Sequence, residues 1–256
     1  MENNSRRNFI RRTTLCGIAA FCLPPVESFA SIINESSITK LKDGAVILFQ
    51  GDSITDGNRG RNEDPNHIMG HGYAFSLASR VGADYPEKAY HFYNRGISGN
   101  KVNDLAARWQ KDTLDLKPDV LSILVGINET GSVVLQREPV ISIGKYEEIY
   151  IELLEQTLSK FPDIMFVLCE PFILKVGRLK DKWEEYHSDV IQRQAIVRKL
   201  ANRYNTVFVG FQEVFDSACE KAPADYWNWD GVHPTVAGHE LMARKWINEV
   251  QKRISF

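Results

Sequence analysis

The chain has 256 residues, of which 43% are hydrophobic and 25% are charged, and its formal net charge is −2. This length supports one compact domain with a full hydrophobic core. The near-balance of charge gives no basic excess for binding nucleic acid, and no apolar run reaches the ~20 residues that a membrane-spanning helix needs.

The first thirty residues have the features of an export signal. Ser5-Arg6-Arg7-Asn8-Phe9-Ile10 resembles the twin-arginine motif, an apolar stretch follows at 14–23, and Ser28-Phe29-Ala30 supplies the small residues of a cleavage site. We therefore predict a signal peptide over 1–30, a single domain over 31–256, and an exported protein, periplasmic or secreted, without membrane insertion once the signal is removed. A disordered basic tail is the alternative, and the choice between Tat and Sec export stays open.

Short apolar segments then alternate with longer segments of helical periodicity. The expected strands are Ala45–Phe49, His91–Asn94, Val120–Val125, Ile164–Cys169 and Thr206–Val209. The expected helices are Tyr73–Tyr85, Val102–Leu116, Tyr146–Phe161, Ser188–Tyr204 and Thr235–Ile254. This alternation predicts an α/β fold with a mostly parallel sheet covered by helices on both faces. In such sheets, sites gather at the carboxyl ends of the strands.

Long loops and cysteines add two further expectations. The loops at 57–72 and 172–187 are candidates for the walls of a site. Cys169 and Cys219, which remain after residue 30, lie in no metal-binding or redox spacing. Export permits a disulfide between them, but two separate buried thiols are the favoured interpretation.

A candidate nucleophile follows directly on the first predicted strand, in the segment Gly51–Gly57 (GDSITDG). Ser53 lies there at the carboxyl end of the strand, on a turn flanked by glycines. A serine hydroxyl is a weak nucleophile until a base takes its proton, so this hypothesis requires a histidine. A serine that only caps the following helix is the alternative.

The candidate base lies near the other end of the chain, in the loop before the last predicted helix. Asp230 and His233 are three residues apart there. The carboxylate can accept the proton of one ring nitrogen, which leaves the other nitrogen for Ser53. A capping loop with a surface histidine is the alternative. His67 and His71, in the loop after Ser53, are weaker candidates that would line the pocket.

Acyl transfer also needs donors for the developing oxyanion. Gly99, in a loop after the second predicted strand, permits a close approach of its backbone N–H to the site. Asn128 follows the third predicted strand and would place its amide at the same edge of the sheet. An ordinary glycine turn and a turn-stabilising asparagine are the alternatives.

The order of these blocks resembles the SGNH hydrolases, also called the GDSL esterase family, over essentially the whole chain after the signal. The matching residues are Ser53, Gly99, Asn128 and His233, with Asp230 in the triad position. The resemblance implies a flavodoxin-like three-layer α/β/α sandwich with a central parallel five-stranded sheet. It also implies an oxyanion hole formed by the N–H groups of Ser53 and Gly99 and the side chain of Asn128. Glu129 departs from the family, many of whose members have Asp there.

A finer resemblance links the segments 94–100, 104–109, 117–119 and 229–239 to the acetylxylan esterase branch. It implies a serine esterase that removes acetyl groups from plant polysaccharides or oligosaccharides, with an acetylated carbohydrate or small ester as substrate. It implies no cofactor and no metal, and since the branch includes oligomers, a homo-oligomer is compatible with it. We expect Asp52, Tyr73 and Trp229 to line the substrate pocket, with core packing as the alternative for Tyr73 and Trp229.

Three other functions fit parts of the sequence. A lysophospholipase or thioesterase would use the same catalytic residues, although no lid-like apolar stretch favours long acyl chains. A metal hydrolase would use Asp52, His67, His71, Asp230 and His233 but would leave Ser53 idle. A non-catalytic carbohydrate-binding protein on the same fold is the alternative from another class.

Overall fold

The computed structural model describes residues 38–62 and 64–256, which lie within one compact unit, Ser36–Phe256. The signal peptide predicted over 1–30 lies outside the described residues, so it and the domain boundary after residue 30 stay predictions. Within the described ranges, no helix combines the length and the apolar character that crossing a membrane requires.

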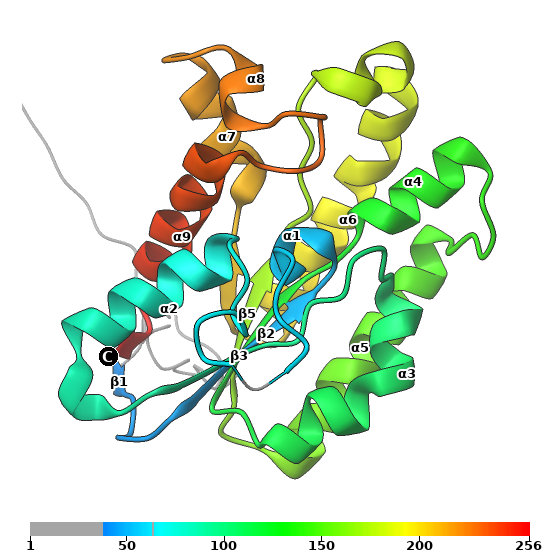
Figure 1. Ribbon diagram of the computed structural model, residues 1–256. Coiled ribbons are helices and arrows are strands. Elements are labelled where there is room, and N and C mark those ends of the chain that lie inside the picture. The colour runs from blue at the N-terminus through cyan, green and yellow to red at the C-terminus, as the bar shows by residue number, and fades with distance from the viewer. Residues whose placement is uncertain (1–37, 63) are drawn as a thin grey trace, which may run out of the picture. The chain divides into compact units, whose positions relative to one another are not determined.

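A parallel sheet of five strands forms the centre of the fold, in the order β3-β2-β4-β5-β6 (Figure 1). The strands are β2 (Val46–Gly51), β3 (His91–Asn94), β4 (Val120–Leu124), β5 (Met165–Cys169) and β6 (Val207–Val209). This order is that of flavodoxin-like folds, and it confirms the predicted fold class. Each strand begins and ends within two residues of its predicted bounds. A short second sheet pairs β1 (Thr39–Lys40) with β7 (Ile254–Ser255).

Helices cover both faces of this sheet (Figure 1). One face carries α2 (Tyr73–Asp84), α7 (Phe211–Cys219) and α9 (Val236–Val250), and the other carries α3 (Val102–Asp112) and α5 (Ile143–Lys160). The long helix α6 (Trp183–Arg203) contributes side chains to both core clusters. The remaining helices are α1 (Ser53–Asp56), α4 (Ile127–Leu135), α8 (Ala224–Trp227) and the 3₁₀ segments Pro86–Lys88, Leu114–Leu116 and Gly177–Lys182.

The apolar runs of the strands form two core clusters, one on each face. Ile47 and Phe49 of β2 pack on one side of the sheet and Leu48 packs on the other, as the alternation of side chains along a strand requires. A buried tryptophan anchors each cluster. The Trp246 indole N–H donates to Ser122 Oγ at 2.9 Å, and that of Trp109 donates to Thr157 Oγ1 at 3.0 Å. Because both N–H groups are paired, the rings add apolar contact without an unsatisfied donor.

The helices also differ from the predictions. Helices α3 and α9 end four residues before their predicted ends, α5 begins three residues before its predicted start, and the four-residue helices α1 and α8 were not predicted. Helix α6 begins at Trp183, five residues before the predicted start, although Trp183, Tyr186 and Val190 already have helical spacing. Helix α4 was not predicted, since it is short, contains a glycine and follows β4 after only two residues. Helix α7 was also missed, although its buried residues Phe211, Phe215 and Ala218 have helical spacing. Cys169 and Cys219 are free thiols in separate elements.

Asn94, the last residue of β3, connects the loops around the carboxyl end of the sheet. Its buried Nδ2 donates to the carbonyl oxygens of Thr55, Asp56 and Met69 at 2.7, 3.2 and 3.0 Å. Its Oδ1 accepts the Gly96 N–H at 2.9 Å. This one side chain therefore fixes the positions of α1, the 57–72 loop and the β3–α3 loop relative to one another.

Replacing Asn94 with leucine should destabilise the fold. Asn94→Leu leaves buried backbone groups without their partner, so we expect the free energy of unfolding to fall by about 2–4 kcal/mol. Urea denaturation measures this change. Asn66→Leu is the matched control, because the exposed Asn66 side chain bonds only to Asp64. A loss at position 94 no larger than that of the control would contradict this role.

Candidate active site

The site begins where the order of the strands reverses. Strand β2 lies between β3 and β4, and Ser53 follows its carboxyl end as the first residue of α1. In α/β sheets this reversal is the usual position of ligand sites. Gly51 makes the tight connection, since a Cβ there would lie 2.3 Å from the Leu124 carbonyl oxygen. Asp52 Oδ1 then accepts the Ile54 N–H at 3.0 Å and caps α1.

Three side chains from the two ends of the chain meet at this position. The Ser53 Oγ lies 2.8 Å from His233 Nε2, across 180 residues of sequence. His233 Nδ1 lies 2.9 Å from Asp230 Oδ2. The structure therefore brings together the three residues predicted as nucleophile, base and orienting acid, in the connectivity of a serine–histidine–aspartate triad.

Asp230 is held as a carboxylate. Burial acts to raise its pKa, but hydrogen bonds from the His233 ring and from the backbone N–H groups of His233 and Val232 lower the pKa to about 2. Its Oδ1 accepts those N–H groups at 2.7 and 2.9 Å, while Oδ2 faces the ring. The negative charge at neutral pH favours the tautomer of His233 with its proton on Nδ1, which leaves Nε2 free to accept the Ser53 proton.

Glycines allow the loop that carries Asp230 and His233 to pack tightly. Gly177 has a φ of +53°, and a Cβ there would lie 2.5 Å from the Asp230 Cα. Gly231 has a φ of +97°, and its N–H donates to Asn228 Oδ1 at 2.7 Å. These contacts place the 228–234 loop directly against the loop before α6.

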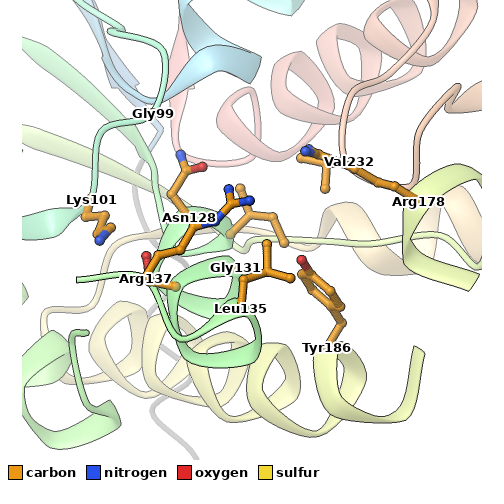
Figure 2. Close-up of a pocket in the computed structure, with 11 residues that line it drawn as sticks. Gly99, Lys101, Asn128, Gly131, Leu135, Arg137, Arg178, Tyr186 and Val232 are labelled. Atoms are coloured by element: carbon orange, nitrogen blue, oxygen red, sulfur yellow. The ribbon is translucent and has the colours of Figure 1, made fainter. Parts of the chain in front are cut away.

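Two of the three predicted oxyanion donors, Gly99 and Asn128, line one pocket (Figure 2), and Ser53 is not among its lining residues. Gly99 has a φ of +83° and lies on a loop that the Ile97 N–H ties to the Gly51 carbonyl at 3.1 Å. Within the described residues, the Gly99 N–H donates no hydrogen bond. Asn128 Nδ2 donates one proton to the Asn100 carbonyl at 3.1 Å and keeps a second for a ligand.

The residues predicted to line the substrate pocket divide into two groups. Asp52 and Tyr73 are fully buried, and Tyr73 pairs its hydroxyl with Thr55 Oγ1 at 3.1 Å, so both support the site from beneath. Trp229 is 65% exposed and its ring stacks on His233, with centroids 6.2 Å apart. Only Trp229 of the three therefore offers a surface to a substrate.

His67 and His71 do not join the pocket that contains Gly99 and Asn128. Both are exposed on the 57–72 loop, where His67 Nε2 lies 3.7 Å from Asp64. Over residues 38–62 and 64–256, no three His, Cys, Asp or Glu side chains converge as a metal-binding group.

The pocket has a volume of about 150 Å³, and sequence reasoning missed its three cationic residues and its tyrosine. They are Lys101, Arg137, Arg178 and Tyr186. Arg178 also reaches the candidate triad, with its Nε 3.2 Å from Asp230 Oδ2. No motif marks these positions, because they come from separate loops and helix ends that only the fold brings together.

Two further buried carboxyls lie below the site. Burial raises the pKa of Asp52 and that of Glu129 to about 7 each. Each uses one oxygen to accept a backbone N–H, from Ile54 and Val102 respectively. Glu129 thereby links α4 to the start of α3.

Comparisons with known proteins show which family the chain resembles. A profile of the GDSL-like lipase/acylhydrolase family matches residues 49–241. The acetylxylan esterase of Geobacillus stearothermophilus is 33% identical over 216 residues, which cover 82% of this chain and 96% of that protein. A crystal structure of an acetylxylan esterase from the same organism has a TM-score of 0.73 at 33% identity, covering 83% of this chain and 96% of that one. A structure described as a GDSL-like lipase, from Parabacteroides merdae, has a TM-score of 0.80 at 39% identity, covering 84% of this chain and 99% of that one.

The protonated Asp52 should make stability depend on pH. In the folded protein its pKa is about 7, against 3.8 for an aspartate in the unfolded chain, so between these values the folded state binds a proton that the unfolded chain releases. This stabilising contribution is complete below pH 3.8 and disappears as the pH rises through about 7. The side chain at position 52 in Asp52→Asn is uncharged at every pH. The free energy of unfolding of this variant, relative to that of the wild type, should therefore rise by about 2 kcal/mol between pH 5 and 8.

Urea denaturation at both pH values tests this prediction. Asp163→Asn, which changes an exposed carboxylate, is the control and should show a difference that does not vary with pH. A pH-independent difference for Asp52→Asn as well would show that Asp52 is already charged in the folded state at pH 5.

Proposed function

The chain belongs to the GDSL-like lipase/acylhydrolase family, and we propose that it is a serine esterase that removes acetyl groups from plant polysaccharides or oligosaccharides. Family membership makes it a carboxylic ester hydrolase, as the sequence predicted. The contact of Ser53 Oγ with His233 Nε2 at 2.8 Å carries the assignment of the catalytic residues.

In the proposed mechanism, Ser53 Oγ attacks the ester carbonyl while His233 Nε2 takes its proton. Asp230 holds the ring by Nδ1 and stabilises the imidazolium that forms. The carbonyl electron pair moves to oxygen, where the N–H groups of Ser53 and Gly99 and the amide of Asn128 donate to it.

Collapse of this tetrahedral intermediate breaks the bond to the sugar oxygen, which takes the proton from His233. A water molecule then gives a proton to the same nitrogen and attacks the acyl-enzyme. This second step releases the acid and restores the Ser53 hydroxyl with the proton that His233 returns.

Two observations support a short acyl group. The pocket beside Gly99 and Asn128 is small, about 150 Å³, and mostly polar in its lining residues. Drug-sized ligands occupy sites of about 300–1,000 Å³, so this space leaves no room for a long alkyl chain beside the proposed oxyanion donors. Similarity to an acetylxylan esterase supports the carbohydrate part of the proposal.

Hydrolysis of longer lipid or thioester acyl chains is the second candidate. The similarity to a structure described as a GDSL-like lipase favours it, since that chain is 39% identical. The residues of the proposed mechanism are the same for both substrates, so only acyl-chain preference separates them.

We also propose that the protein is exported. The support is the twin-arginine-like segment at residues 5–10 and the cleavage-site pattern that ends at Ala30. A periplasmic or secreted enzyme would meet acetylated glycans outside the cytoplasm, which fits the proposed substrate.

The experiment compares p-nitrophenyl acetate with p-nitrophenyl octanoate and measures acetate release from acetylated xylan and xylo-oligosaccharides. We expect kcat/KM to be at least about tenfold higher for the acetyl ester, and acetate to be released from the glycans. Ser53→Ala should lower all these rates by at least about 10⁴-fold with an unchanged circular dichroism spectrum, because it removes the nucleophile.

Ser188→Ala, which changes an exposed serine on α6, is the control and should keep full activity. Faster octanoate hydrolysis would favour the lipase candidate. Undiminished turnover by Ser53→Ala would reject Ser53 as the nucleophile and with it the proposed mechanism.

A further inference from the structure

Three cationic side chains converge on the pocket next to Gly99 and Asn128. Lys101 precedes α3, Arg137 follows α4, and Arg178 lies in the 3₁₀ segment before α6. No acidic side chain is among the residues that line this pocket. The chain as a whole carries a net charge of −2, so a cluster of three positive charges is a local feature of the site.

The positive charge of this pocket is largely uncompensated. Within the described residues, neither Lys101 nor Arg137 forms a salt bridge, and Lys101 Nζ donates to the Pro139 carbonyl at 2.6 Å. Arg178 contacts Asp230, but that carboxylate is already engaged by His233.

A buried hydroxyl faces the same space. Tyr186 of α6 is only 6% exposed, and Figure 2 shows its oxygen directed into the pocket. Within the described residues this hydroxyl has no hydrogen-bond partner. Arg137 and Arg178 line the same pocket as Tyr186. Burial raises the pKa of Tyr186, while the charges of Arg178 and Arg137 act in the opposite direction.

This combination of donors matches a carboxylate. Guanidinium groups present paired N–H donors that fit the two oxygens of a carboxylate, and a phenolic hydroxyl can add a third bond. Arg137 and Arg178 are both exposed, so solvent pairs with their guanidinium groups until a ligand binds. An anionic group would satisfy both the guanidinium groups and the hydroxyl, and it would lie next to the donors proposed for the oxyanion.

We propose that the substrate is an acetyl ester of an acidic saccharide, whose uronic acid carboxylate is bound by Arg137, Arg178 and the Tyr186 hydroxyl. This inference rests on the proposed esterase function, since an acetyl acyl group leaves only the alcohol part of the substrate to carry the charge. The carboxylate lies within about one sugar residue of the ester, because Gly99 and Asn128 border the same pocket.

The test compares an O-acetylated methyl glucuronoside with its methyl ester, which differ only in the charge of the carboxyl group. We expect the wild-type kcat/KM to be at least about tenfold higher for the free acid, the effect of one charge-assisted hydrogen bond, mainly through a lower KM. Arg137→Gln should bring the ratio of the two rates to within about twofold of unity. Arg137→Lys should restore part of the preference, because it keeps the charge.

Salt and a matched control separate this effect from a general one. Arg203→Gln changes an arginine of similar exposure at the far end of α6, and it should keep the wild-type ratio. In 1 M NaCl, where charges are screened beyond about 3 Å, the wild-type preference should fall by at least half.

The failures of the two proposals are distinguishable. Equal kcat/KM values for the free acid and its methyl ester would overturn the proposed acidic substrate, and so would a ratio of these values that Arg137→Gln leaves unchanged. Hydrolysis of p-nitrophenyl acetate in the same experiment would still support the esterase function. Absence of hydrolysis for both glucuronosides and for p-nitrophenyl acetate would overturn both.

Discussion

The hydrogen bond between Ser53 and His233 is the interaction on which the rest of the account depends. It joins residues 180 positions apart, and it forms only because the sheet brings the end of β2 and the loop before α9 to the same edge. Neither side chain alone has the chemistry of a catalyst, since a serine needs a base and a histidine needs a fixed tautomer. The fold supplies both conditions, with Asp230 held as a carboxylate behind the ring.

Close backbone packing and hydrogen bonds fix the segments on either side of the Ser53–His233 hydrogen bond. Gly51 and Gly177 allow backbone contacts that any side chain would obstruct, and they fix the two loops that carry the triad. Asn94 ties the loop after Ser53 to the end of β3. The pocket, by contrast, is lined by charged side chains from loop positions such as Arg137 and Arg178.

The sequence predicted the parts of the structure that follow from local patterns. Local patterns identified the uninterrupted apolar strands, the glycine-flanked Ser53 and the Asp230–His233 pair, because each needs a specific residue type at a specific spacing. Tyr73 was expected in the pocket, but its position on the buried face of α2 places it in the core. The approach of Arg137, Arg178 and Tyr186 has no local signature, because it depends on how α4, α6 and two loops pack together.

Labelling with a fluorophosphonate, followed by peptide mapping, tests the central contact most directly. The account predicts a single adduct on the peptide that contains Ser53, formed at least about 10²-fold more slowly in His233→Ala because the hydroxyl then has no base. An adduct on another residue, or equal labelling rates in the wild type and in His233→Ala, would contradict it.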